Sequence, residues 1–199
     1  MPASPTSSRI RSTRTSRRSV LRAIAAFVLV ACAHPLALAD VVPVHNAEVR
    51  IEDEQVLLNA DFDVSLNSTL EEALQRGVPL YFVLEADVQR PRWYWFDEKV
   101  MQHSAQYRVS YLPLTRQYRV SSGLLSQTFD AIEEVERFLG RVNARAIGRA
   151  AELEKGSRYD VVVRLRLDAN QLPKPFQVNA LASREWQLAS DAVRIPLVP

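Results

Sequence analysis

Apolar and polar residues alternate along several segments of this chain. In residues 56–66 the even positions are apolar and the odd positions from 59 to 65 are polar: Val56, Leu58, Ala60, Phe62, Val64 and Leu66 against Asn59, Asp61, Asp63 and Ser65. Residues 48–52, 80–88 and 158–168 show the same alternation. Successive side chains of a strand point to opposite faces, so each segment predicts a strand with one buried face. Burial of one face is typical of antiparallel sheets.

A short repeat predicts one hairpin. The sequence Gln-Tyr-Arg-Val-Ser occurs twice, once before and once after Pro113. Two similar strands around a short loop indicate a β-hairpin. In this hairpin we expect Val109 to face Val120 and Tyr111 to face Tyr118, because matched side chains on neighbouring strands stabilise a sheet.

Two helices interrupt the predicted strands. The first covers about residues 68–77, where Ser68 and Glu71 have the spacing of a capping box and Gly77 supplies the C-terminal cap. The second covers about residues 128–143, where apolar residues recur at helical spacing: Phe129, Ile132, Val135, Phe138, Leu139 and Val142. Strands interrupted by two helices predict a β-rich α+β fold, built as an antiparallel sheet or a sandwich.

Residues 1–39 have the order of an export signal. Six arginines and no acidic residue flank or precede an apolar run at 23–33, and a small-x-small sequence ends the segment. The run is shorter than the ~20 apolar residues that a membrane-spanning helix needs. We therefore expect signal cleavage between Ala39 and Asp40, which leaves a single domain over 40–199 in the bacterial periplasm.

Two other interpretations of this segment stay open. The sequence from Leu29 to Cys32 resembles a lipoprotein box, in which the single cysteine of the chain is acylated and becomes the first residue. The protein would then be a lipid-anchored structural scaffold at a membrane. The adjacent Arg17 and Arg18 resemble a twin-arginine export signal, which is read as an address.

The basic charge of the chain comes from the predicted signal. The chain has 25 Lys and Arg and 23 Asp and Glu; removing the six signal arginines and no acidic residue leaves a net charge of −4. Nucleic-acid-binding domains carry a basic patch, so we expect no nucleic-acid partner. We also expect no cofactor and no metal site, because only His45 and His103 follow the signal and no phosphate-binding glycine loop or G-x-S-x-G motif occurs.

Two segments are candidates for contact with a partner. The first holds four consecutive aromatic residues, Trp93, Tyr94, Trp95 and Phe96. They predict either a stacking surface for a peptide, glycan or lipid edge, or a strand that is covered on both sides. The second is 172–176, with Pro173, Lys174, Pro175 and Phe176. Its two prolines predict an extended, non-helical path, which serves either as a docking segment or as a stiff crossover.

Four carboxylates offer a catalytic alternative. Asp61, Asp63, Glu85 and Asp87 occupy polar positions of two predicted strands, and facing strands would bring them within reach of one another. Such a site would hydrolyse an envelope polymer. Arginines hold the equivalent positions elsewhere: Arg108, Arg119, Arg164 and Arg166. Cross-strand pairs of acids and arginines would account for both sets of charges without catalysis.

Several segments carry a resemblance to a known family. They are 70–82, with Leu-Glu-Glu-Ala-Leu and Gly-Val-Pro-Leu-Tyr-Phe, 90–95, 113–119, and 167–186 with its Leu-Pro-Lys-Pro core. These segments resemble the uncharacterised bacterial family 4390 of domains of unknown function, and the resemblance covers essentially the whole chain after the signal. It implies an exported, single-domain proteobacterial protein of a kind also described as proline-rich signal-peptide proteins. It assigns no catalytic residue.

The chain departs from this family at one place. The resemblance implies a tryptophan-containing strand near 143–150, where this chain has Arg145-Ala146-Ile147.

Taken together, the sequence predicts a non-catalytic envelope or periplasmic protein that binds a protein or an envelope component through the two candidate contact segments. The envelope-polymer hydrolase and the lipid-anchored scaffold are the alternatives.

Overall fold

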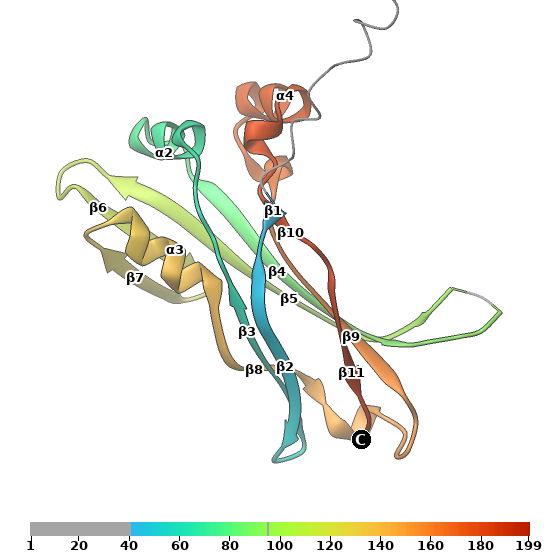
Figure 1. Cartoon of the computed structure of the whole chain (residues 1–199). Helices are drawn as coiled ribbons and strands as arrows, with labels where there is room; N and C mark the ends of the chain where they lie inside the picture. The colour runs from blue at the N-terminus through green and yellow to red at the C-terminus, as the bar shows by residue number, and fades with distance from the viewer. Residues whose placement is uncertain (1–40, 95) are drawn as a thin grey trace, which may run out of the picture. The chain divides into compact units, whose positions relative to one another are not determined.

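The alternating segments form two β-sheets (Figure 1). A computed structural model describes residues 41–94 and 96–199, which fall within one compact unit. The predicted signal with Cys32, the expected cleavage site at Ala39 and Asp40, and Trp95 lie outside the described residues.

The large sheet has eight strands. Their order is β1 (Val41–Val42), β10 (Ala189–Ser190), β9 (Tyr159–Leu167), β4 (Leu80–Arg90), β5 (Glu98–Leu112), β6 (Gln117–Ser122) and β7 (Leu125–Phe129), and β11 (Val193–Leu197) also pairs with β9. All pairs are antiparallel except β1 with β10. The predicted hairpin is confirmed in its register, because Val109 pairs with Val120 and Tyr111 with Tyr118.

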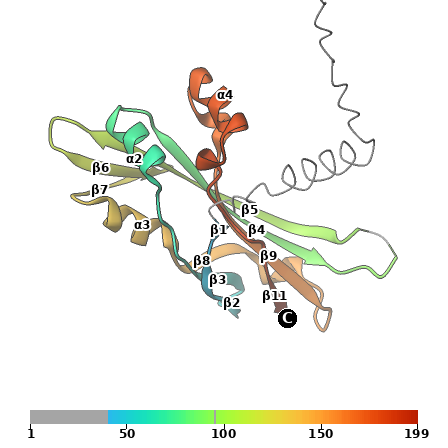
Figure 2. The same ribbon diagram turned by 45° about the horizontal axis from the view of Figure 1, so that its top comes forward.

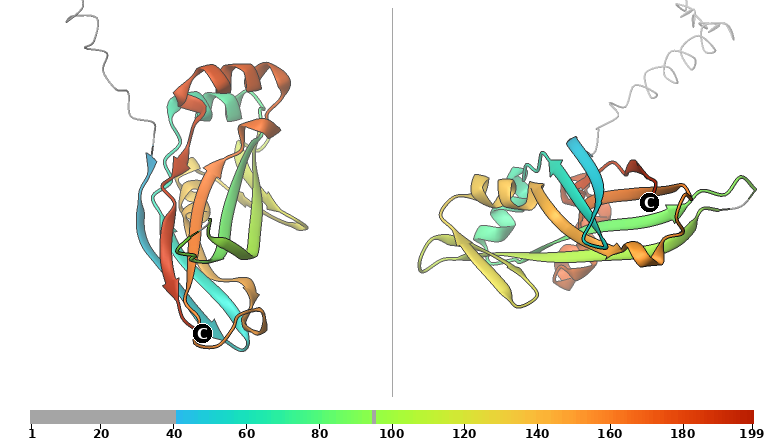
Figure 3. Two further views of the ribbon diagram at one scale, coloured as in Figure 1. Left: turned by 90° about the vertical axis from the view of Figure 1, so that its right-hand side faces the viewer. Right: turned by 90° about the horizontal axis from the view of Figure 1, so that it is seen from below.

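The small sheet has three antiparallel strands in the order β2 (Val44–Glu52), β3 (Gln55–Phe62) and β8 (Arg141–Arg149). It forms a second layer against the large sheet (Figure 3). The core lies between the two layers and takes the apolar positions of the alternating strands, such as Leu58 on β3, Phe82 and Leu84 on β4, and Leu165 on β9. The β-rich α+β fold is therefore confirmed.

Within residues 41–94 and 96–199, three α-helices accompany the sheets: α2 (Ser68–Gln75), α3 (Ile132–Gly140) and α4 (Lys174–Ala182). The chain also contains short 3₁₀ turns at η1 (Ala150–Glu152), η2 (Ala169–Gln171) and η3 (Arg184–Trp186). Helix α2 lies where it was expected, but its N-cap is Asn67 rather than Ser68. The Asn67 side chain accepts a hydrogen bond from the Leu70 N–H, so it satisfies one of the free N–H groups at the helix start.

The second predicted helix is too long at both ends. Phe129 ends strand β7 and Val142 lies in strand β8, so only the middle of 128–143 is helical. The apolar stripe misled the prediction because Phe129, Val135 and Val142 all pack on the same core although they belong to three different elements. Pairing of β7 with β6 and of β8 with β3 overrides the helical spacing.

The prediction of a non-helical path at Pro173 and Pro175 is wrong. Pro173 is the N-cap of α4 and Pro175 lies in its first turn. Backbone N–H groups in the first turn of a helix have no partner within that helix, so a proline there removes no hydrogen bond, and its fixed φ favours the helix start. The helix is compatible with both prolines for this reason.

Candidate functional site

The predicted aromatic contact lies at the end of a long hairpin (Figure 2). Strand β9 pairs with β4 only as far as Gln89, so the hairpin formed by β4 and β5 continues beyond it as two strands. The connecting turn leaves Trp93 91% exposed, Tyr94 65% and Phe96 86%. These three residues, here named the aromatic tip, do not form the covered strand of the second interpretation; Trp95 lies outside the described residues.

Charged contacts hold the base of the hairpin. Arg194 on β11 donates to Oδ2 of Asp97 at 3.1 Å, and Arg92 pairs with Glu98 across the hairpin. Within the tip, the Trp93 and Tyr94 rings meet edge to face with their centroids 5.0 Å apart. The tip is therefore an apolar surface on a base that is fixed to the large sheet.

The second predicted contact segment is mostly part of the structure itself. Leu172 is buried, and the ring of Phe176 packs against Trp186 with centroids 5.6 Å apart. Pro173, Lys174 and Pro175 are exposed. The segment begins helix α4, well away from the hairpin tip in all views (Figures 1–3). The two predicted contacts therefore do not form one surface.

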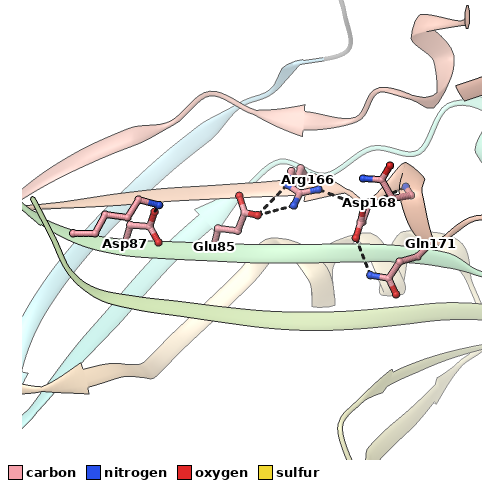
Figure 4. Close-up of polar contacts among 7 residues, drawn as sticks. Glu85, Asp87, Arg166, Asp168 and Gln171 are labelled. Atoms are coloured by element: carbon pink, nitrogen blue, oxygen red, sulfur yellow. Dashed lines mark hydrogen bonds and ion pairs between the residues drawn. The ribbon is translucent and has the colours of Figure 1, made fainter. Parts of the chain in front are cut away.

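The structure separates the four carboxylates of the hydrolase alternative into two pairs. Glu85 and Asp87 lie on one face of β4, where Glu85 accepts two hydrogen bonds from Arg166 and Asp87 pairs with Lys99 (Figure 4). Asp61 and Asp63 belong to the small sheet or to the chain just after it. Asp61 lies 4.0 Å from Arg141, and Asp63 lies 3.6 Å from the imidazole of His45.

The charges around Glu85 form a row along this face. Arg166 also lies 3.6 Å from Asp168, which accepts a hydrogen bond from the Gln171 amide at 2.8 Å (Figure 4). Burial raises the pKa of Asp168, but hydrogen bonds from Gln171 and Asn170 and the charge of Arg166 outweigh burial, so its pKa is lowered. The Glu85–Arg166 pair is the kind of cross-strand pair that the alternation predicted.

A hollow between α3, β8 and β5 was missed by the sequence reasoning. It is here named the basic groove and is lined by His103, Tyr107, Phe138, Arg141, Asn143 and Arg145. The Tyr107 and Phe138 rings meet nearly edge-on, with centroids 6.3 Å apart. Nη2 of Arg145 donates to the Tyr107 hydroxyl at 2.7 Å. Aromatic and guanidinium groups thus share one wall.

The positive charge of the groove resides on its arginines. Burial, and next the charge of Arg145, lower the pKa of His103, which keeps its imidazole neutral near pH 7. The Nε2 atom of His103 is buried and has no hydrogen-bond partner among the described residues. Arg145 bonds to the Tyr107 hydroxyl rather than to a carboxylate. Arg141 is largely exposed, and Asp61 approaches it only to 4.0 Å.

The backbone of β8 is irregular at the groove. Ala144 has a φ of +43°, a left-handed conformation that is rare for a residue other than glycine. The side chain of Asn59 on β3 holds it in place by accepting a hydrogen bond from the Ala144 N–H at 2.7 Å. Strained backbone of this kind is often found at functional sites. Ala144, with this left-handed backbone, lies between the two groove residues Asn143 and Arg145.

One signal in the sequence could have revealed this groove. Residues 137–149 contain four arginines and no acidic residue: Arg137, Arg141, Arg145 and Arg149. Their spacing of four is that of one face of a helix. In the structure, a helix ends and a strand begins within this run, so only some of these arginines reach the groove.

Two further properties concern only the part of the chain that the structure describes. No three His, Cys, Asp or Glu side chains gather there in a way that would hold a metal ion. No helix among those residues is both long enough and apolar enough to cross a membrane.

The model of a protein family, a domain of unknown function (DUF4390), matches residues 39–196. No curated protein and no solved structure matches the chain.

Proposed function

The chain belongs to the DUF4390 family of domains of unknown function, and on that premise we propose that it is a non-catalytic binding protein of the bacterial cell envelope. Its partner is a protein or another envelope component. The contact is made by the aromatic tip, Trp93, Tyr94 and Phe96.

The exposure of the tip carries this proposal. Trp93 is 91% and Phe96 86% exposed at the end of a two-stranded projection. Large aromatic side chains contribute most when they are removed from water, and they are enriched at the energetically dominant positions of interfaces. Leaving them in water is unfavourable for an isolated domain, so a cluster of them indicates a surface that a partner covers.

The envelope location rests on the order of residues 1–39. A basic segment, an apolar run and a small-x-small sequence support export with cleavage between Ala39 and Asp40. Acylation of Cys32 is the lipid-anchored alternative. Intact mass of the protein purified from its host distinguishes the two, because cleavage before Asp40 gives an unmodified chain and acylation gives a chain that starts at Cys32 and carries lipid.

The Leu172–Phe176 segment remains a second, smaller contact in this proposal. Only Pro173, Lys174 and Pro175 are exposed for it, since Leu172 and Phe176 pack inside. Lys174→Ala therefore has a much smaller expected effect on partner capture than changes at the tip.

Photocrosslinking tests the tip directly. A photoreactive phenylalanine derivative replaces Trp93 in one variant and Leu114 in a control, since Leu114 is also fully exposed but lies in the turn between β5 and β6. We expect a discrete crosslinked product in intact host cells only from position 93. The protein found in that crosslinked product is the partner. A Trp93→Ala/Phe96→Ala variant, with its fold verified by circular dichroism, should capture this partner at least tenfold less than the original protein does.

The matched control for the double variant is Leu114→Ala/Leu124→Ala, which also removes two fully exposed apolar side chains. Capture should be unchanged in this control. Equal crosslinking from positions 93 and 114, or unchanged capture by the folded tip variant, would contradict the proposal.

A further inference from the structure

The basic groove continues into a second, more apolar hollow. The two hollows have volumes of about 480 and 510 Å³ and share Tyr107, Phe138 and Arg145 in their walls. Volumes of ~300–1,000 Å³ are typical of small-molecule sites. Because three residues line both hollows, a ligand of moderate length would contact both at once.

The first hollow is polar and positively charged. Arg141 and Arg145 line it together with the Asn143 amide, and no carboxylate is among its wall residues. An adjoining hollow adds Arg137 and one carboxylate, Glu134. That carboxylate accepts a hydrogen bond from the Asp130 N–H in the chain just before α3. No carboxylate therefore lines the first hollow itself, and Asp61 approaches Arg141 only to 4.0 Å.

Guanidinium groups select for a particular ligand head. Their planar set of N–H donors matches carboxylates and phosphates, and charged hydrogen bonds of this kind are roughly twice as strong as neutral ones. Since His103 is neutral near pH 7 and the groove has no carboxylate, the head that complements it is an anion.

The second hollow is suited to an apolar group. Val120 and Leu125 on β6 and β7 line it beside the rings of Tyr107 and Phe138. Leu125 is 79% and Phe138 38% exposed, so apolar surface that would gain from burial is available there. Burying such surface yields ~25 cal/mol per Å².

We propose that the basic groove binds an anionic amphiphile, with its carboxylate or phosphate head at Arg141 and Arg145 and its acyl chain against Tyr107, Phe138 and Leu125. Free fatty acids and anionic phospholipids share this chemistry. The site is separate from the aromatic tip, so it does not depend on the proposed function.

Binding is measured by calorimetric titration of the full chain with dodecanoate and dodecyl phosphate below their micelle concentrations. Dodecyl maltoside has the same chain without charge, and acetate and inorganic phosphate have the heads without a chain. We expect saturable binding of the two charged amphiphiles at one site, and affinities at least tenfold weaker for the three partial ligands.

The variant Arg141→Gln/Arg145→Gln should lose at least tenfold in affinity for dodecanoate. Arg149→Gln is the matched control, because Arg149 lies on the same strand but is exposed, pairs with Glu152 and does not line the groove. Its affinity should stay within twofold of the original protein. Trp93→Ala/Phe96→Ala should also bind normally, which separates this site from the tip.

Arg145→Gln breaks the bond to Tyr107, so Arg141→Gln alone is a second variant that keeps this bond. It should still weaken dodecanoate binding by about fivefold or more.

Transfer of a fluorescent phosphatidylglycerol, but not phosphatidylcholine, from vesicles to the protein would assign a phospholipid source; dodecanoate binding without transfer would assign a free acid. Four outcomes would overturn the proposal. Two concern the ligand: dodecyl maltoside binds as tightly as dodecanoate, or a free peptide carboxylate binds instead. The others are equal dodecanoate affinity in the double variant and in Arg149→Gln, and no binding at all.

Discussion

Arg145 on β8 donates a hydrogen bond of 2.7 Å to the hydroxyl oxygen of Tyr107 on β5, and this bond joins the small sheet to the large one. Tyr107 is nearly buried, and its ring also meets Phe138 of α3. Three elements therefore converge on one side chain at the wall of the basic groove.

Tyr107→Phe should lower the free energy of unfolding by about 1 kcal/mol. The ring contact with Phe138 remains, but the charged guanidinium of Arg145 loses its acceptor. Hydrogen bonds to charged groups contribute ~1.5–3 kcal/mol. Arg145 is only half-buried, so water solvates it in the variant and offsets part of this loss. Urea denaturation measures the change. Tyr111→Phe is the control, because its ring packs on Tyr118 and no described residue bonds its hydroxyl; equal losses in both variants would contradict the prediction.

Tyr159→Phe should cost more, about 1–3 kcal/mol. Tyr159 is fully buried, and its hydroxyl oxygen accepts from the Glu154 N–H at 2.9 Å and from Arg90 at 3.0 Å. Removing that oxygen leaves a backbone N–H without its acceptor, although the cation–π contact of Arg90 with the ring persists. Thermal unfolding measures the loss. Tyr81→Phe is the control, because Tyr81 lies on β4 of the same sheet but is only half-buried; a loss no larger than in this control would argue against the role of the Tyr159 hydroxyl.

Gly140→Ala should destabilise the domain more than Gly148→Ala. A Cβ at Gly140 would lie 2.2 Å from the backbone oxygen of Phe62, so strand β3 or helix α3 must move. Overpacking of this kind costs ~1–3 kcal/mol. A Cβ at Gly148 meets the sulfur of Met101 instead, and a methionine side chain can turn away. Urea midpoints of the two variants decide the order.

Glu136→Gln should change how stability depends on pH. Burial raises the pKa of Glu136, although the hydrogen bond that it accepts from the Leu66 N–H opposes the shift. A raised carboxyl pKa means that the folded state binds the proton more tightly. The contribution of Glu136 is therefore most favourable below its ordinary pKa and is lost as the pH rises through the raised value.

The glutamine retains an oxygen that can accept from Leu66 but never becomes charged. Relative to the original protein, the variant should therefore gain stability between pH 4 and pH 7. Urea denaturation at several pH values across that range gives the difference. A constant difference at all pH values would show that Glu136 does not titrate as described.

Local pattern predicted those parts of the fold that depend on neighbours in the chain. The register of Val109 with Val120 follows from a repeat around a short turn, and the capped helix near 68–77 follows from a local signal. The error at 128–143 arose because Phe129 and Val142 continue the helical stripe while their backbones pair with other strands. Periodicity reports which side chains are buried but not which partner satisfies the backbone.

The two candidate sites differ in the same way. The aromatic residues of the tip are consecutive, so they could be identified from the sequence, although only the structure shows that Trp93, Tyr94 and Phe96 are exposed. The basic groove joins Tyr107 to Arg145, which are 38 residues apart and belong to different sheets. The arginines of residues 137–149 indicate a basic surface, but no alternation or helical spacing encodes a contact between two layers. The fold was therefore needed to show that Arg145 meets Tyr107.

The position of β9 in the large sheet has a consequence for how the protein folds. Strand β9 pairs with β4 along one edge and with β10 and β11 along the other, so Leu167 must find Phe82 before the centre of the sheet exists. Contacts between distant parts of a chain form slowly, because a long loop must close first. The edge of β4 that β9 covers therefore has no partner until residues 160–167 reach it, which makes the pairing of these two strands a late step in folding.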